Sequence, residues 1–120
     1  MSRAADILLR EILDAVELIQ RYTAQLTFEE FASNIEKQDA VIRRLEIIGE
    51  AVKGLPTDLR DKYPDIPWRD IAGARDILIH EYFRVDPELA WEMAREDLPR
   101  LASEIEEIIR NEGVNNNGLS

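Results

Sequence analysis

The sequence predicts an all-α protein, an up-and-down four-helix-type bundle, because apolar residues recur at helical spacing along most of the chain. Residues that cap, start or end helices separate these periodic stretches. The strict alternation of a β-strand, an internal repeat and a glycine-rich phosphate loop are all missing from the sequence. Together these observations favour helices that pack side by side around one core.

The first helix is expected to begin after Ser2, which can cap it, and to run to about Ala24. Its apolar residues form a single stripe made of Ala5, Leu8, Leu9, Ile12, Val16 and Ile19. Thr27-Phe28-Glu29-Glu30 and Ser33-Asn34-Ile35-Glu36 both have the pattern of a capping box. We therefore expect the chain to bend and restart near these two segments.

The second long helix is expected from about Asn34 to Lys53, and its apolar residues alternate between spacings of four and three. This seam consists of Val41, Leu45, Ile48, Val52 and Leu55. Gly54 and Pro56 should end the helix. The connector that follows, residues 55–66, contains prolines and should form a short extra turn at residues 58–62.

Pro67 favours a third helix that carries Trp68 and continues to about Tyr82, because proline is tolerated in a first turn. Asp86-Pro87 likewise provides an N-cap and a first-turn proline for the last long helix. The apolar stripe of that helix comprises Ala90, Ala94, Leu98, Leu101, Ile105 and Ile108. Pro99 lies inside it and should kink it, because proline cannot donate a backbone hydrogen bond.

Length and composition indicate one domain with a core of its own, since 45% of the 120 residues are hydrophobic. We expect a helical domain over residues 1–112 and a disordered C-terminal tail over residues 113–120, which lack periodicity. No apolar run is long enough to cross a bilayer, and the N-terminus lacks the apolar segment of a signal peptide. The absence of cysteine excludes disulfides and thiolate metal sites. A soluble cytoplasmic protein is the default expectation.

The net charge of −10 argues against a protein that coats nucleic acid, because phosphate binding normally requires a basic face. The charge is uneven, however: residues 41–84 hold eight acidic and eight basic residues, whereas the flanking parts are acidic. This distribution is compatible with a small basic-lined site within an acidic surface, and it does not favour an extended nucleic-acid groove.

The candidate site lies in residues 75–82, which contain the only histidine of the chain, His80. Histidine can take and give protons near neutral pH. Arg75 is a fixed cation suited to phosphate, and Tyr82 adds a hydroxyl. On one regular helix, Arg75 and Tyr82 share a face, while Asp76 and His80 share another, so Asp76 could accept a hydrogen bond from the His80 ring.

Because Arg75 and His80 diverge on a regular helix, either the helix frays before His80 or two copies face each other on a two-fold axis and build a composite site. The ordinary interpretation must be weighed beside this one: a lone histidine on a helix is usually a surface residue. Trp68 and Trp91 are more typical of core aromatics than of a base-stacking platform. Arg43-Arg44 is more typical of the exposed side of a helix, and one histidine among scattered acids is weak support for a metal site.

Three segments together resemble the HepT branch of the HEPN superfamily: residues 41–51 (VIRRLEIIGEA), residues 63–73 (YPDIPWRDIAG) and residues 75–82 (RDILIHEY). The specific part is an arginine, four residues, a histidine, one residue and a tyrosine, matched here by Arg75, His80 and Tyr82. The resemblance extends over nearly the whole chain to about Ile109. One departure is Asp76, where the family commonly has asparagine, and its negative charge beside the arginine could slow cleavage.

The resemblance implies a homodimeric HEPN bundle that acts as the toxin of a type VII-like toxin–antitoxin system, a metal-independent endoribonuclease without a cofactor. Arg75 and His80 would be the catalytic residues at the dimer cleft, with Asp76 in support. The implied partner is a cognate minimal nucleotidyltransferase antitoxin, which neutralises the toxin by AMPylation of Tyr82. The alternative is a non-catalytic HEPN binding subunit that docks a nucleotidyltransferase and presents nucleotide or substrate. Nothing specific favours a purely structural helical dimer.

Overall fold

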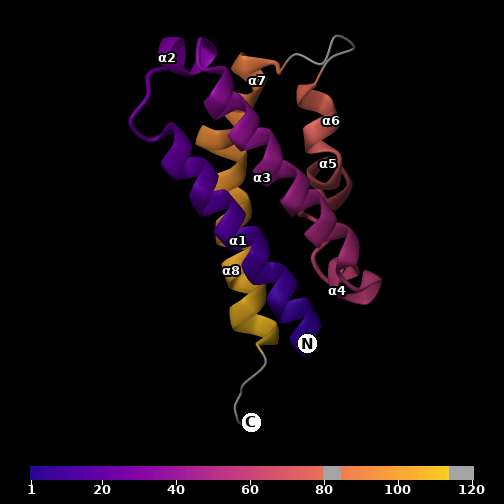
Figure 1. Ribbon diagram of the computed structural model, residues 1–120. Helices are drawn as coiled ribbons and strands as arrows, with labels where there is room; N and C mark the ends of the chain where they lie inside the picture. Colours follow the sequence, from indigo (N-terminus) through magenta and orange to yellow (C-terminus); the bar gives the residue numbers. More distant parts are fainter. Residues whose placement is uncertain (80–84, 114–120) are drawn as a thin grey trace.

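The computed structural model describes residues 1–79 and 85–113, and Figure 1 shows how their helices are arranged. The elements are α1 (Arg3–Thr23), α2 (Phe28–Ala32), α3 (Ile35–Gly54), α4 (Thr57–Asp61), α5 (Trp68–Ala72), α6 (Ala74–Leu78), α7 (Pro87–Glu92), the π-helical turn η1 (Met93–Asp97) and α8 (Leu98–Glu112). Three long columns, formed by α1, α3 and α7–η1–α8, stand together, and α5 with α6 forms a shorter column beside α3 (Figure 1). The predicted all-α, four-helix-type bundle is confirmed.

Side chains at the helix starts explain where the first long helices begin. The Ser2 hydroxyl accepts a hydrogen bond from the Ala5 N–H at 3.0 Å, as expected for an N-cap. Thr27 and Glu30 form the predicted capping box, with distances of 3.1 and 2.9 Å. The second expected box is wrong: Asn34 caps α3, while the Ser33 hydroxyl donates back to a carbonyl of α2. The amide oxygen of asparagine is as good a cap as a serine hydroxyl, and it moves the start by one residue.

The core lies between α1, α3 and the α7–η1–α8 column, and it confirms the predicted apolar stripes. The seam of α3 is buried along its whole length, with exposed fractions of 0–2% at Val41, Leu45, Ile48, Val52 and Leu55. In α1 the stripe is buried except at Leu8, which is half-buried. Each fully buried Leu or Ile side chain contributes roughly 1.5–3 kcal/mol, so these stripes supply much of the folding free energy.

The expected continuous helix from Trp68 to about Tyr82 is wrong. The segment forms two five-residue helices, α5 and α6, that meet at Gly73 with φ −101° and ψ 6°. Glycine is a poor helix former, and here it ends one helix and caps the next. Helix α6 stops at Leu78, and Ile79 is extended and pairs with Val85 in an isolated antiparallel bridge. The helix therefore ends before His80, as in the first alternative, and the second alternative, a composite site on a two-fold axis, stays a prediction.

The 55–66 connector contains the predicted extra turn, α4, and Trp68 fixes it to the bundle. The Trp68 side chain is buried, and its indole Nε1–H is shared between the carbonyls of Arg60 and Tyr63 at 3.2 and 3.1 Å. A buried indole normally finds such a partner. Trp91 is half-buried against Phe31, with ring centroids 5.5 Å apart. Both tryptophans belong to the core, as predicted.

The last column begins as the sequence predicts, and the distortion expected at Pro99 takes the form of a π-helical turn. The Asp86 side chain accepts from the Leu89 N–H at 3.1 Å, and Pro87 occupies the first turn of α7. The Leu98 N–H donates to the carbonyl of Met93, five residues earlier, which is the bond of a π-helix. Pro99 follows directly and has no N–H to continue the α-helical pattern.

A polar clasp joins the connector to the end of α8. Lys62 Nζ donates to Glu112 Oε1 at 3.0 Å, and the Tyr63 hydroxyl donates to Glu112 Oε2 at 2.9 Å. The hydrogen bond from Lys62, followed by that from Tyr63, lowers the pKa of Glu112. A lowered carboxylate pKa means that the clasp stabilises the fold above the ordinary pKa of glutamate and is lost as the pH falls through the folded value.

Two further expectations concern the C-terminal tail and membrane-spanning helices. The expected tail over residues 113–120 lies outside the described residues apart from Gly113. Within residues 1–79 and 85–113, the structure holds no helix with the length and the apolar character that a bilayer crossing requires.

Helix α3 approaches α5 closely at Gly49. A Cβ atom built on Gly49 would lie 2.8 Å from the carbonyl oxygen of Ala72, a distance that real Cβ contacts do not show. The contact partner is backbone, so it cannot rotate away. Glycine at this position therefore sets the spacing between α3 and the α5–α6 column.

We predict that Gly49→Ala destabilises the protein by about 1–3 kcal/mol, because the added methyl group forces two backbones apart. The matched control is Gly54→Ala in the same helix, where a Cβ would meet the flexible Leu8 side chain at 3.1 Å. Chemical denaturation of both variants checks the prediction. Equal stability of the two variants would contradict it.

Candidate active site

Of the four predicted site residues, Arg75 and Asp76 are described and lie on α6, whereas His80 and Tyr82 lie outside the described residues. Arg75 is half-buried, with 41% of its side chain exposed, and Asp76 is 80% exposed. Arg75 thus stands at the edge of the bundle, on the last helix before the segment that carries the histidine. The expected position of Asp76 one turn before His80 on a regular helix is wrong, because α6 ends at Leu78.

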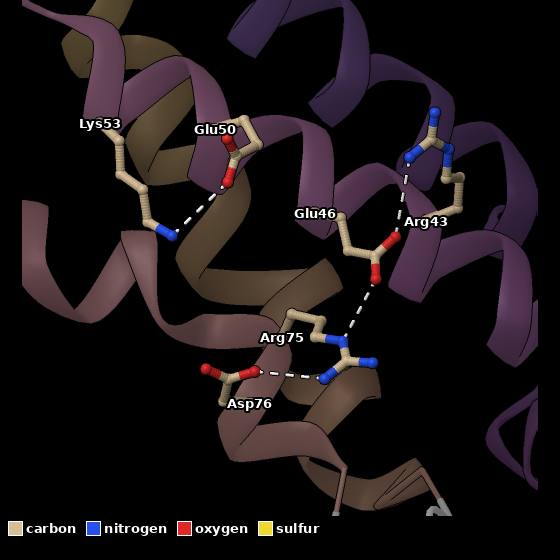
Figure 2. Close-up of polar contacts among 6 residues, drawn as sticks. All are labelled: Arg43, Glu46, Glu50, Lys53, Arg75 and Asp76. Carbon is tan, nitrogen blue, oxygen red and sulfur yellow. Dashed lines mark hydrogen bonds and ion pairs between the residues drawn. The ribbon is translucent and has the colours of Figure 1, made fainter.

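Two carboxylates hold the guanidinium of Arg75 (Figure 2). Its Nε forms an ion pair with Glu46 Oε2 at 3.2 Å, across from α6 to α3. Its Nη1 donates to Asp76 Oδ1 at 3.2 Å. The third nitrogen, Nη2, forms no hydrogen bond or ion pair with any residue in the described part of the chain. Arg75 therefore has one hydrogen-bonded nitrogen, Nη1, and one nitrogen, Nη2, that described residues leave unengaged. Its Nε lies in an ion pair with Glu46, but its N–H has no hydrogen-bond partner among the described residues.

Glu46 is the functional candidate that the sequence alone did not indicate. Its second oxygen, Oε1, lies 3.7 Å from Arg43 Nη1 on the same helix, so the carboxylate bridges two arginines (Figure 2). Arg43 is 65% exposed, as predicted for the outer side of α3, whereas Arg44 is half-buried. No local pattern could have revealed Glu46, because its partner on α6 is distant in sequence.

These side chains line an open groove of about 400 Å³ between α3 and α5–α6. Its lining contains three cationic residues and three carboxylates, Arg43, Lys53, Arg75, Glu46, Glu50 and Asp76. Lys53 and Glu50 pair with each other at 3.5 Å (Figure 2). The formal charges of these six side chains balance, so a phosphate that enters the groove competes with the carboxylates for the arginines. Among described residues, no group of three or more potential ligands is placed to hold a metal ion.

A second cavity, of about 290 Å³, lies on the other side of α6, between α5–α6 and the η1–α8 column. Its lining is mainly apolar and includes Ile71, Ile77, Met93 and Leu101. Ile77 follows the charged pair of Arg75 and Asp76 in the sequence, and it is a large hydrophobic residue that is 49% exposed. Helix α6 therefore separates a charged groove from an apolar one.

A family model described as Ribonuclease HepT-like matches residues 12–108 of the chain. A similar protein named "Probable ribonuclease HepT", from Thermococcus cleftensis, is 44% identical over 108 residues, which cover 90% of this chain and 98% of that protein. "Putative RNase MJ1216", from Methanocaldococcus jannaschii, is 46% identical over 112 residues, which cover 92% of this chain and 93% of that protein.

A longer relative from Methanocaldococcus jannaschii, named "Gamma-glutamylcyclotransferase and putative RNase MJ0434", is 47% identical over 117 residues. Those residues are 98% of this chain and 53% of the relative, so the chain spans about half of that protein. No solved structure matches the chain. The family model covers most of the chain and the shorter relatives match it nearly end to end. The chain therefore belongs to the HepT-like family of the HEPN superfamily.

Proposed function

We propose that this protein is a metal-independent endoribonuclease with Arg75 and His80 as catalytic residues and Asp76 in support. The observation that carries the proposal is the placement of Arg75: it is half-buried at a groove, held by two carboxylates, on the helix just before the only histidine of the chain. The relatives named as RNases support the same activity. We assign the function to a helical domain of residues 1–112, followed by a tail.

The chemistry requires little beyond these two side chains. RNA carries its own nucleophile, so the 2′-oxygen attacks the adjacent phosphorus, the bond to the 5′-oxygen breaks, and a 2′,3′-cyclic phosphate forms. One proton leaves the 2′-hydroxyl and one is given to the 5′-oxygen. His80 can act as general base or general acid, typically worth about 10²–10⁴-fold in rate. Arg75 can stabilise the charge that develops on the phosphoryl oxygens.

A homodimer would complete this site. The reaction moves two protons, the chain has one histidine, and two copies on a two-fold axis would supply two. The apolar cavity beside α6 supports such an assembly, since Ile77 leaves half of a large hydrophobic side chain in solvent next to it. Packing that face against its copy would bring the two α6 helices, which carry the Arg75 residues, close to one another.

We further propose that the protein is the toxin of a toxin–antitoxin pair and that a cognate minimal nucleotidyltransferase silences it by AMPylation of Tyr82. In that reaction the tyrosine oxygen attacks the α-phosphorus of ATP and pyrophosphate leaves. The adenylate adds negative charge and bulk two residues after His80, where substrate phosphate would bind.

The second candidate is a non-catalytic subunit that docks a nucleotidyltransferase. One observation favours it: both carboxylates at Arg75 neutralise the cation on which catalysis would depend. The measurements below separate the two candidates.

Arg75→Ala and His80→Ala should each reduce RNA cleavage by at least about 10²-fold, because each removes a group that acts only in the transition state. The assay is cleavage of a labelled RNA pool by purified protein, with circular dichroism to establish that the variants fold. Cleavage should persist in EDTA. Loss of activity on chelation that a divalent ion restores would overturn the metal-independent mechanism.

Ile77→Asp should convert a dimer into a monomer and abolish cleavage, because it places a charge in an apolar interface. The control is Ile35→Asp, which alters an isoleucine that is 71% exposed at the start of α3. Light scattering at micromolar concentration distinguishes the two states. A monomeric wild-type protein that cleaves RNA would contradict the dimer.

Co-expression with the proposed cognate nucleotidyltransferase should add AMP to the wild-type protein and silence it. Tyr82→Phe removes the acceptor oxygen, so this variant should gain no mass and should stay toxic. Intact-mass spectrometry and growth curves provide the two readouts. An unchanged mass with a bound partner would favour the docking subunit instead.

A further inference from the structure

We propose that Glu46 is a positioning residue that fixes the orientation of Arg75, whereas Asp76 is the counter-ion that the substrate phosphate displaces. The inference rests on the proposed ribonuclease function, and it assigns opposite roles to the two carboxylates that touch one guanidinium. It also gives Arg43 a role, since Arg43 holds the second oxygen of Glu46.

Glu46 is the more firmly held of the two carboxylates. It projects from α3, the long helix buried along its seam, and both of its oxygens face an arginine, at 3.2 and 3.7 Å. Its side chain is 39% exposed. The backbone beneath it is also fixed, because Gly49, one turn further along α3, lies against the Ala72 carbonyl of α5. A carboxylate held at both oxygens on a packed helix can define where its partner points.

Asp76 has the opposite character. Its side chain is 80% exposed, and one oxygen contacts one nitrogen of Arg75, its neighbour in sequence. It stands on α6, a helix of five residues. An exposed ion pair of this kind contributes little, because solvent competes for both partners. A phosphate can therefore replace Asp76 at low cost.

The geometry of the Arg75 guanidinium indicates how it would bind a phosphate when Glu46 stays in place and Asp76 leaves. Glu46 engages Nε, so the free side of the group is the end that carries Nη1 and Nη2. When Asp76 leaves Nη1, this end presents two parallel N–H donors, the arrangement that binds phosphate in a bidentate manner. Glu46 remains beside Nε as its ion-pair partner at 3.2 Å, and this charge favours one orientation of the planar group. Such preorganised donors stabilise developing charge without reorganisation during the reaction.

The two roles predict opposite signatures in kinetics and binding. Glu46 adds negative charge to the groove, so it weakens RNA binding while it raises the rate of the bound complex. Glu46→Gln should therefore lower the single-turnover rate at saturating RNA by about 10–10²-fold, since a misplaced group costs of that order. Its affinity for RNA blocked by 2′-O-methyl groups should stay equal or become tighter. Asp76→Asn should tighten binding of the same blocked RNA, because it removes the charge that competes with the phosphate for Nη1 of Arg75.

The test measures these rates and dissociation constants for the wild type, Glu46→Gln and Asp76→Asn, with Glu17→Gln as control. Glu17 forms an exposed ion pair with Arg21 on α1 at 3.1 Å, away from the groove. In an Arg75→Ala background, Glu46→Gln should have no further effect on rate, because a positioning residue acts only through its partner. Rotation of the Arg75 guanidinium about its Nε–Cζ bond, followed by NMR, should be slow in the wild type and in Asp76→Asn and faster in Glu46→Gln.

The outcomes distinguish this inference from the proposed function. A wild type that does not cleave RNA overturns the ribonuclease, and the NMR measurement then still decides whether Glu46 holds Arg75. A wild type that cleaves, together with Glu46→Gln at the wild-type rate, overturns the positioning role alone. A parallel loss of rate, affinity and melting temperature in Glu46→Gln would show a structural role and would also overturn it.

Discussion

The packing of α3 against neighbours on two sides is the constraint on which the rest of the structure depends. One side carries the buried seam that meets α1, and the other lies against α5–α6, where Gly49 allows close approach. Protein interiors are close-packed, so α3 cannot move toward one neighbour without opening a gap at the other. The position of Arg75 relative to Glu46 therefore follows from the core rather than from the surface side chains themselves.

Features that depend on neighbouring residues were predictable from the sequence, and features that depend on tertiary contacts were less so. The caps at Ser2, Thr27 and Asp86 are correct, because a capping side chain acts within its own turn. The helix expected to run through His80 is wrong, because apolar content alone does not separate one helix from two short ones. Gly73 was the available signal, and its low helix propensity decides where the break falls.

The candidate site divides in the same way. Arg75 and Asp76 could be selected from the spacing of one short segment, and the family resemblance that rests on it is confirmed. Glu46 could not be selected in this way, because its contact with Arg75 joins two helices and produces no sequence pattern in either helix. The role of Gly49 could not be predicted for a related reason. A glycine does not contribute to a hydrophobic stripe, and Gly49 matters because it has no Cβ atom to clash with the Ala72 carbonyl oxygen.

The antiparallel bridge between Ile79 and Val85 joins the point where the chain leaves α6 to the point where it approaches α7. Beside it, the Asp86 N–H donates to the Leu78 carbonyl at 2.8 Å, so two contacts close the base of this connection. Because these two contacts join the ends of the segment, the packing of the helices depends little on the number of residues between Ile79 and Val85. Doubling the length of such a closed segment costs only about 0.6 kcal/mol in closure free energy. A change in the number of residues between Ile79 and Val85 would therefore cost the bundle little folding free energy, but it would alter the spacing of Arg75, His80 and Tyr82 on which the proposed chemistry depends.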